Sequence, residues 1–190
     1  MNFLAHLHIA EHSQSSLLGN LLGDFVKGDP QGKFDDQIVQ GVRLHRFVDA
    51  YTDSHQLILQ SKQLFPNGHR RFAGIALDMF WDHCLARDWQ NYHDLTLKDF
   101  CDYAEQTVNG TQASLPEAFV RTNSLMWKGR WLESYRELDN IEYALQRMSL
   151  RSSRMGKLAE CYPYLEQNYA SLNQVFSTLY PQILNASKRF

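Results

Sequence analysis

This chain has few cysteines and no long apolar run, and each shortage excludes a class of protein. Its three cysteines, Cys84, Cys101 and Cys161, are far apart and form no CxxC pair. We therefore expect neither a disulfide framework nor a cysteine-ligated zinc site, and we expect a reducing, cytoplasmic environment. No stretch approaches the roughly 18 apolar residues of a membrane span, and the opening MNFLAHLHIAEH lacks the basic segment of a signal peptide.

The chain also lacks an excess of one charge. It has 19 Lys+Arg against 21 Asp+Glu, so a general electrostatic attraction to nucleic acid or to a membrane surface is not expected. The motifs GxSxG, GxxxxGK[ST], GxGxxG and HExxH are absent as well. Serine or cysteine nucleophile chemistry thus has no recognisable anchor, and water activated by a metal ion is the mechanism that remains.

Apolar residues recur at helical spacing through nearly the whole chain, and no run of apolar and polar alternation indicates a strand. No repeat, low-complexity segment or linker marks a second domain. We therefore predict one all-α domain over residues 1–190, an irregular helical bundle of seven to nine helices. The predicted helices are 15–27, 35–53, 56–65, 70–89, 96–108, 116–127, 131–150, 155–162 and 163–187.

Histidine and aspartate interrupt the apolar face of the helix predicted at 35–53. Ile38, Val42, His45 and Asp49 follow one another at i, i+4, i+7 and i+11, which places them on one side of the helix. The apolar stripe that should face the core therefore continues into an imidazole and a carboxylate. Buried groups of this kind need a partner, and a divalent metal ion satisfies several of them at once.

The helix predicted at 70–89 repeats this pattern. Asp78 and Asp82 lie on one face between Ile75 and Leu85, so both carboxylates are expected to face the core. His83 lies about 100° round the helix from Asp82 and would reach the same centre only from its edge. For a single pair, a surface ion network or a satisfied core histidine is an alternative, but three such segments together favour a metal site.

Further candidates lie near the start of the chain. Asp24 is close to the C-terminal end of its predicted helix, where a carboxylate opposes the helix dipole, and a ligand role would explain it. His6 and His8 would share one side of an extended segment but would be separated by a helix, and either is a candidate ligand or a core histidine. The dipeptide His93-Asp94 lies in a polar connection, and we expect it to be structural.

Basic residues suggest contacts to a phosphate and to a partner. Arg46 follows His45 directly and could hold a phosphate through two hydrogen bonds, with an ordinary surface arginine as the alternative. Lys27 could also meet a phosphate oxygen, although a solvated lysine is the simpler reading. Four cations three or four residues apart could form one ridge if the helix persists, which would be an ordinary solvated face or would dock an acidic partner. They are Arg147, Arg151, Arg154 and Lys157.

Several segments closely resemble the acyl carrier protein phosphodiesterases. They are MNFLAHLH at 1–8, GNLLGDFVKG at 19–28, GVRLHRFVDAYTD at 41–53, LDMFWDH at 77–83 and NSLMWKGRWLESY at 123–135. The resemblance implies an all-helical, HD-domain-like fold, dependence on manganese, and removal of the 4′-phosphopantetheine group from holo-acyl carrier protein, an acidic protein substrate. The usual His…His-Asp…Asp order of the HD-type phosphohydrolases is not present, so that order does not assign the metal ligands here.

The resemblance and the residue pattern together predict a site for one or two divalent ions. Mn²⁺ is expected, with Mg²⁺, Fe²⁺ or Co²⁺ as alternatives. The predicted metal ligands are His6, Asp24, His45, Asp49, Asp78 and Asp82. The predicted catalytic residues are Asp24, Arg46 and His83. An HD-type phosphohydrolase of nucleotides is the alternative function, and a non-catalytic helical binding protein is a weaker one.

Overall fold

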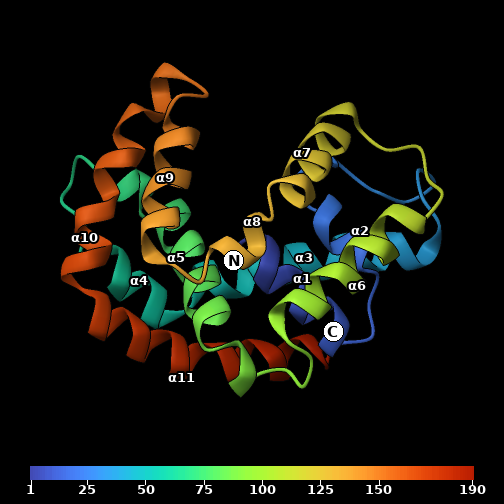
Figure 1. The fold of residues 1–190 in the computed structure, drawn as a ribbon, viewed down its shortest axis with the longest axis horizontal. Coiled ribbons are helices and arrows are strands. Elements are labelled where there is room, and N and C mark those ends of the chain that lie inside the picture. The colour runs from blue at the N-terminus through green and yellow to red at the C-terminus, as the bar shows by residue number, and fades with distance from the viewer.

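The computed structural model describes all of residues 1–190, and the chain is helical with no strand, as predicted (Figure 1). It forms eleven α-helices and three 3-10 helices, which exceeds the predicted seven to nine. None of the helices is both long and apolar enough to cross a bilayer. The elements are α1 Phe3–His12, α2 Leu17–Leu22, α3 Asp36–Ser54, α4 Gln56–Lys62, η1 Arg70–Phe72, α5 Ala73–Arg87, η2 Trp89–Asn91, α6 Leu97–Gly110, α7 Glu117–Lys128, α8 Trp131–Ser134, α9 Leu138–Ser149, η3 Ser153–Cys161, α10 Tyr162–Gln167 and α11 Tyr169–Ser187.

Several predicted boundaries are wrong, for local reasons. Helix α1 was not predicted, because its residues Leu4–Ala10 are buried on every side and show no one-sided apolar stripe. The segment predicted as one helix at 131–150 is broken into α8 and α9, and the helix predicted at 155–162 is the 3-10 helix η3. The predicted start of α6 is confirmed, since the Thr96 hydroxyl accepts a hydrogen bond from the Asp99 amide at 3.1 Å.

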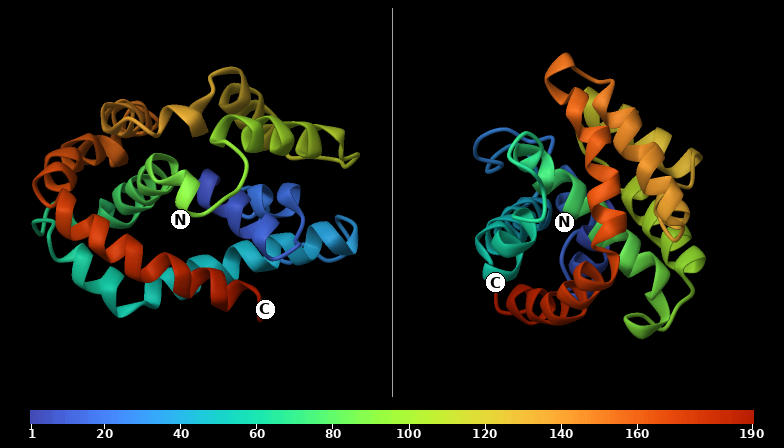
Figure 2. Two further views of the ribbon diagram at one scale, coloured as in Figure 1. Left: turned by 60° about the horizontal axis from the view of Figure 1, so that its bottom comes forward. Right: turned by 90° about the vertical axis from the view of Figure 1, so that its left-hand side faces the viewer.

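Helix α1 is the central element of the fold. It packs against α2, α3, α5 and α11, which together enclose it. Figure 1 shows the N-terminus at the middle of the molecule, with α11 along one side and two arms, α7 and the pair α9–η3, on the other. The left view of Figure 2 shows the same enclosure, with the N-terminus between α11 and the segments of α8 and α9. Side chains on α1 therefore face residues from the first half of the chain and from its last helix.

Helices α2 and α3 pack unusually closely because each has a glycine at the contact. A Cβ atom on Gly19 would lie 2.8 Å from the Cα atom of Gly41, and a Cβ on Gly41 would lie 2.8 Å from the Cα of Gly19. Larger residues would separate the two backbones. This contact sets the start of α3 against α2 and so brings the chain after α2 over the face of α3 that carries His45.

Candidate metal centre

His6, His45 and Asp49 meet between α1 and α3. The Nε2 atom of His6 lies 3.1 Å from Oδ1 of Asp49, and Nε2 of His45 lies 3.0 Å from Oδ2 of the same carboxylate. The two imidazole rings are stacked with their centroids 3.8 Å apart and their planes 19° apart. One donor atom from each residue falls within 4.8 Å of the other two, so the group can hold one metal ion.

The local fold explains why these side chains converge. His45 and Asp49 are one turn apart on α3, on the face that the apolar stripe predicted to be buried. His6 is on the fully buried helix α1, and both imidazoles are buried. A Cβ atom on Gly23 would lie 2.1 Å from the ring of His45. Gly23 therefore leaves the space that the His45 ring occupies.

Asp24 completes one side of the cluster. It follows Gly23 just after α2 ends, and its Oδ1 lies 3.4 Å from Nε2 of His45. Its side chain is 59% exposed, whereas His45 is buried and Asp49 is 36% exposed, so Asp24 is the most exposed of the three. The sequence prediction that Asp24 lies with His45 and Asp49 agrees with this geometry.

The charges of the cluster depend on one another. Burial alone would lower the pKa of His45, but hydrogen bonds and attraction from Asp24 and Asp49 outweigh it and raise the pKa to about 9. Burial and the neighbouring His45 lower the pKa of His6 to about 4. Hydrogen bonds from His45 and His6 overcome burial and hold the pKa of Asp49 well below its usual range. Without metal, one imidazole is thus charged and one neutral around an ionised carboxylate.

Asp78 joins the cluster through the amino group of Met1. That nitrogen lies 2.7 Å from Oδ1 of Asp78 and 3.6 Å from Oδ1 of Asp49. Burial alone would lower the pKa of the amino group, but the two carboxylates raise it to about 10. The carboxyl group of Asp78 is half-buried at the rim. The structure therefore places Asp78 beside the three central residues, with a cation between it and Asp49.

Asp82, also predicted as a metal ligand, lies apart from the three central residues and contacts the start of α1. Its two carboxylate oxygens accept hydrogen bonds from the backbone amides of Leu4 at 2.8 Å and Ala5 at 3.0 Å. These amides belong to the first turn of α1, whose N–H groups have no partner within the helix. Burial outweighs these bonds and raises the pKa of Asp82 to about 7. Asp82 thus holds the start of the helix that carries His6, and it does not join the group around Asp49.

The structure also separates His83 and Arg46 from the cluster. His83 Nδ1 lies 2.9 Å from the carbonyl oxygen of Tyr135, and Nε2 lies 2.8 Å from the hydroxyl of Tyr169, so both ring nitrogens are used. Arg46 donates to the carbonyl oxygens of Gly28 at 2.8 Å and Val26 at 2.6 Å. Its guanidinium therefore fastens the loop that follows Asp24 rather than standing free for a phosphate.

His8 faces the other side of α1. Its Nδ1 lies 2.6 Å from the hydroxyl of Tyr180, and its Nε2 lies 3.2 Å from the carbonyl oxygen of Tyr92. Its ring also packs edge-on against Trp89. His93 belongs to this aromatic group, with its ring centroid 5.8 Å from that of His8. The helix thus separates His6 from His8, and only His6 reaches the carboxylates.

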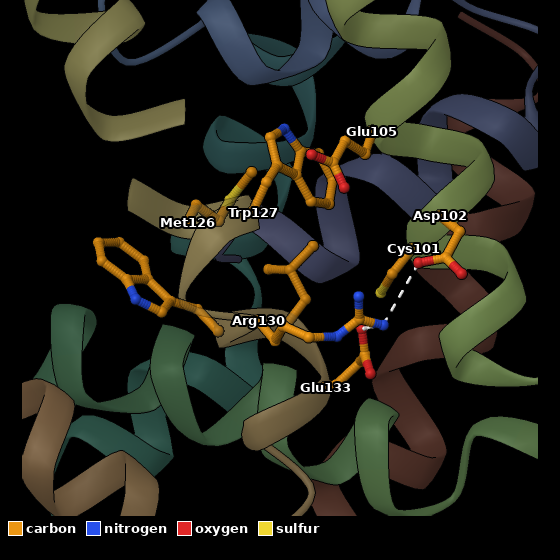
Figure 3. Close-up of a pocket in the computed structure, with 9 residues that line it drawn as sticks. Cys101, Asp102, Glu105, Met126, Trp127, Arg130 and Glu133 are labelled. Atoms are coloured by element: carbon orange, nitrogen blue, oxygen red, sulfur yellow. Dashed lines mark hydrogen bonds and ion pairs between the residues drawn. The ribbon is translucent and has the colours of Figure 1, made fainter. Parts of the chain in front are cut away.

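A second polar cluster lies between α6 and α8 (Figure 3). Arg130 forms ion pairs with Asp102 at 3.3 Å and with Glu133. The cavity beside them, which Trp127 and Cys101 also line, measures only about 10 Å³. That volume is no more than one water molecule needs. The cluster is therefore an ion pair network without room for a ligand.

An all-helical fold that gathers two imidazoles and neighbouring carboxylates has the donor set of a divalent metal site. The family described as acyl carrier protein phosphodiesterase matches residues 1–183. Relatives of that name are 43% identical in Pectobacterium atrosepticum and 42% identical in Yersinia pestis, each over 99% of this chain and 98% of the relative. A third, from Escherichia coli O6:K15:H31, is 38% identical over 100% of this chain and 98% of its own. No solved structure gives a significant match. The chain belongs to the acyl carrier protein phosphodiesterase family, as its motifs predicted.

Proposed function

We propose that this chain is a metal-dependent phosphodiesterase that removes the 4′-phosphopantetheine group from holo-acyl carrier protein and leaves the apo form. Membership of the family supports the substrate. The observation that supports metal-dependent hydrolysis is that ligand atoms of His6, His45 and Asp49 lie within 4.8 Å of one another. The three buried, unpaired thiols and the carrier protein substrate fit a cytoplasmic location.

The residues present fit a divalent transition metal. Imidazole nitrogens favour transition metals and carboxylate oxygens favour harder ions, so a set that mixes them suits Mn²⁺ or Fe²⁺ better than Mg²⁺. His6 and His45 would hold the ion through Nε2, and Asp49 through its carboxylate, with Asp24 and Asp78 beside them. When bound, such an ion lowers the pKa of a water molecule and polarises a phosphoryl oxygen.

The chain's own residues supply position and proton transfer. Asp24 is the most exposed carboxylate of the cluster. Partial desolvation would raise its pKa, but the hydrogen bond and the attraction to His45 lower it, so Asp24 is ionised at neutral pH and can act as a proton acceptor. Arg46 fixes the loop after Asp24 through Val26 and Gly28. Asp82 fixes the first turn of α1 and with it His6. The loop after Asp24 and the helix that carries His6 are thereby held in position around the centre.

Mass spectrometry of holo-acyl carrier protein, before and after incubation with the protein and Mn²⁺, tests this function. We expect the carrier protein to lose the mass of its prosthetic group, and the variant Asp49→Asn to leave it intact. Parallel incubation with nucleotides tests the alternative phosphohydrolase. Intact holo-carrier protein under conditions where Mn²⁺ is bound would refute the proposal, and hydrolysis of nucleotides alone would favour the alternative.

A further inference from the structure

One surface of the molecule is strongly basic although the whole chain has a formal net charge of −2. Residues 63–77 and 147–159 contain no aspartate or glutamate. Their lysines and arginines are exposed, and none of them has a carboxylate oxygen within 4.0 Å. We call this the η1–η3 surface. Its cations are Arg70, Arg71, Arg147, Arg151, Arg154 and Lys157.

The two stretches form one continuous surface. Arg71 donates a hydrogen bond to the carbonyl oxygen of Arg154 at 3.2 Å. His69 lies 2.8 Å from Glu160, and the Lys157 ammonium lies beside Gly68. Segments about 85 residues apart in sequence are thus joined, and their cations add to a single field. The single helical ridge predicted for the last four cations does not form, because α9 ends at Ser149 and η3 begins at Ser153. The bond from Arg71 to Arg154 instead joins η1 to η3.

The η1–η3 surface also carries an exposed apolar residue. Leu150, between α9 and η3, is 78% exposed, more than any other large apolar side chain of the protein. Met148 and Met155 flank it and are half-buried. Arginine and methionine around an apolar centre are typical of surfaces that bind proteins. A purely electrostatic polyanion site would not need this apolar group.

The η1–η3 surface adjoins the candidate metal centre. Arg71, Ile75 and Asp78 follow one another at helical spacing from η1 into α5, so about 10 Å of helix separates Arg71 from Asp78. In the proposed reaction the bond that breaks joins phosphorus to a serine oxygen on the carrier protein itself. The carrier protein must therefore lie directly beside the centre, where this surface can contact it.

A second basic group, on the loop between α2 and α3, is less suited to docking. Arg46 is bound to carbonyl oxygens of that loop, and the Lys33 ammonium donates to the carbonyl oxygen of Lys27 at 3.1 Å. Arg43 donates to Gln31 and lies 3.7 Å from Asp29. These cations hold the loop together, whereas on the η1–η3 surface only Arg71 donates to a backbone carbonyl oxygen and no cation pairs with a carboxylate.

We propose that the η1–η3 surface docks an acidic helical face of the carrier protein, with Leu150 against an apolar side chain at its centre. The proposal rests on the proposed function, since it takes the carrier protein as partner. Opposite charges on the two faces would steer the encounter and fix which part of the carrier protein meets the metal centre.

Binding of holo-carrier protein, measured by calorimetry without added metal, tests this surface separately from hydrolysis. The double variant Arg151→Glu, Lys157→Glu is compared with Arg121→Glu, Lys128→Glu, which makes the same charge change on the exposed face of α7. We expect at least a tenfold increase in Kd for the first and less than a twofold change for the second, with the difference shrinking as salt is added. Retained hydrolysis of a small nitrophenyl phosphodiester by both variants would show that they fold.

Equal Kd values for the wild type and Arg151→Glu, Lys157→Glu would overturn the docking surface, as would equal weakening by the control variant. Failure of the wild type to bind the carrier protein, together with binding to phosphatidylglycerol vesicles, would overturn it in favour of a membrane surface. Tight binding that these variants weaken, without any loss of the prosthetic group in mass spectrometry, would support the surface and refute the proposed function. The two proposals thus fail in different ways.

Discussion

His6 and His8 lie two residues apart on one buried helix, yet the structure gives them opposite surroundings. His6 meets Asp49 and stacks on His45, while His8 meets the hydroxyl of Tyr180 among aromatic rings. Burial lowers the pKa of both histidines to about 4. Neither burial nor a shifted pKa therefore identifies a metal ligand. The carboxylates that face the ring make the difference.

Removing the central carboxylate should have the largest effect. Asp49→Asn takes away the anion that both imidazoles contact. Loss of a residue that only supports a ligand costs 10–100-fold, so we expect loss of Asp49 to lower kcat/KM for holo-carrier protein by more than about 100-fold. The matched control is Asp53→Asn one turn further along α3, where the carboxylate is exposed and pairs with Lys62. Comparable losses in both variants would contradict a centre at Asp49.

The second-largest effect is expected when the space beside His45 is filled. A Cβ atom at Gly23 would overlap the His45 ring, so Gly23→Ala must displace the imidazole. A displacement of about 1 Å in a catalytic group costs on the order of 100-fold in rate. Gly110→Ala at the end of α6 is the control, because nothing lies within 4 Å of its Cβ position. Full activity of Gly23→Ala in a steady-state assay would show that the position of His45 is not critical.

The variant Asp82→Asn tests whether Asp82 supports the start of α1 or binds the metal directly. An asparagine side chain has one acceptor oxygen, so one of the Leu4 and Ala5 amides loses its partner. We expect about 1–3 kcal/mol of destabilisation in urea unfolding and a 10–100-fold weaker metal affinity. Unfolding of the wild type and of Asp82→Asn is measured without metal, since loss of a bound ion would itself destabilise the protein. If Asp82 were instead a direct ligand, metal affinity would fall without any change in the free energy of unfolding of the metal-free protein.

His8→Phe should change stability rather than activity. It leaves the Tyr180 hydroxyl without its partner, which costs about 1–3 kcal/mol, while kcat should stay within twofold of the wild type. Chemical denaturation and the steady-state assay measure the two effects. A large loss of activity in the folded His8→Phe variant would contradict the claim that only the His6 side of α1 belongs to the metal centre.

The same variant should change the pH dependence of stability. The pKa of His8 falls from 6.5 in the unfolded chain to about 4 in the folded one, because of burial. Between these values the unfolded chain binds a proton at His8 that the folded chain does not. The contribution of His8 to the free energy of unfolding is therefore largest above pH 6.5 and decreases as the pH falls towards 4. In metal-free protein, His8→Phe should flatten this slope, and an unchanged slope would contradict a neutral His8.

The sequence predicted the parts of the centre that depend on one helix. The spacing of His45 and Asp49 indicated one buried face, and Asp24 followed from its unfavourable place at a helix end. The role of Asp82 was not predictable in this way. Periodicity tells which face of a helix is buried but not what it meets, and Asp82 meets amides 77 and 78 residues away. For the same reason, His83 was expected near the centre although it bonds Tyr135 and Tyr169.

Titration of Mn²⁺ into the metal-free protein, followed by electron paramagnetic resonance, tests the central claim most directly. His6→Phe and His8→Phe make the same substitution two residues apart on α1. We predict that His8→Phe binds Mn²⁺ as the wild type does, and that His6→Phe binds it at least tenfold more weakly. Equal Mn²⁺ affinity in His6→Phe and the wild type, or loss of binding in His8→Phe, would contradict a metal centre formed by His6, His45 and Asp49.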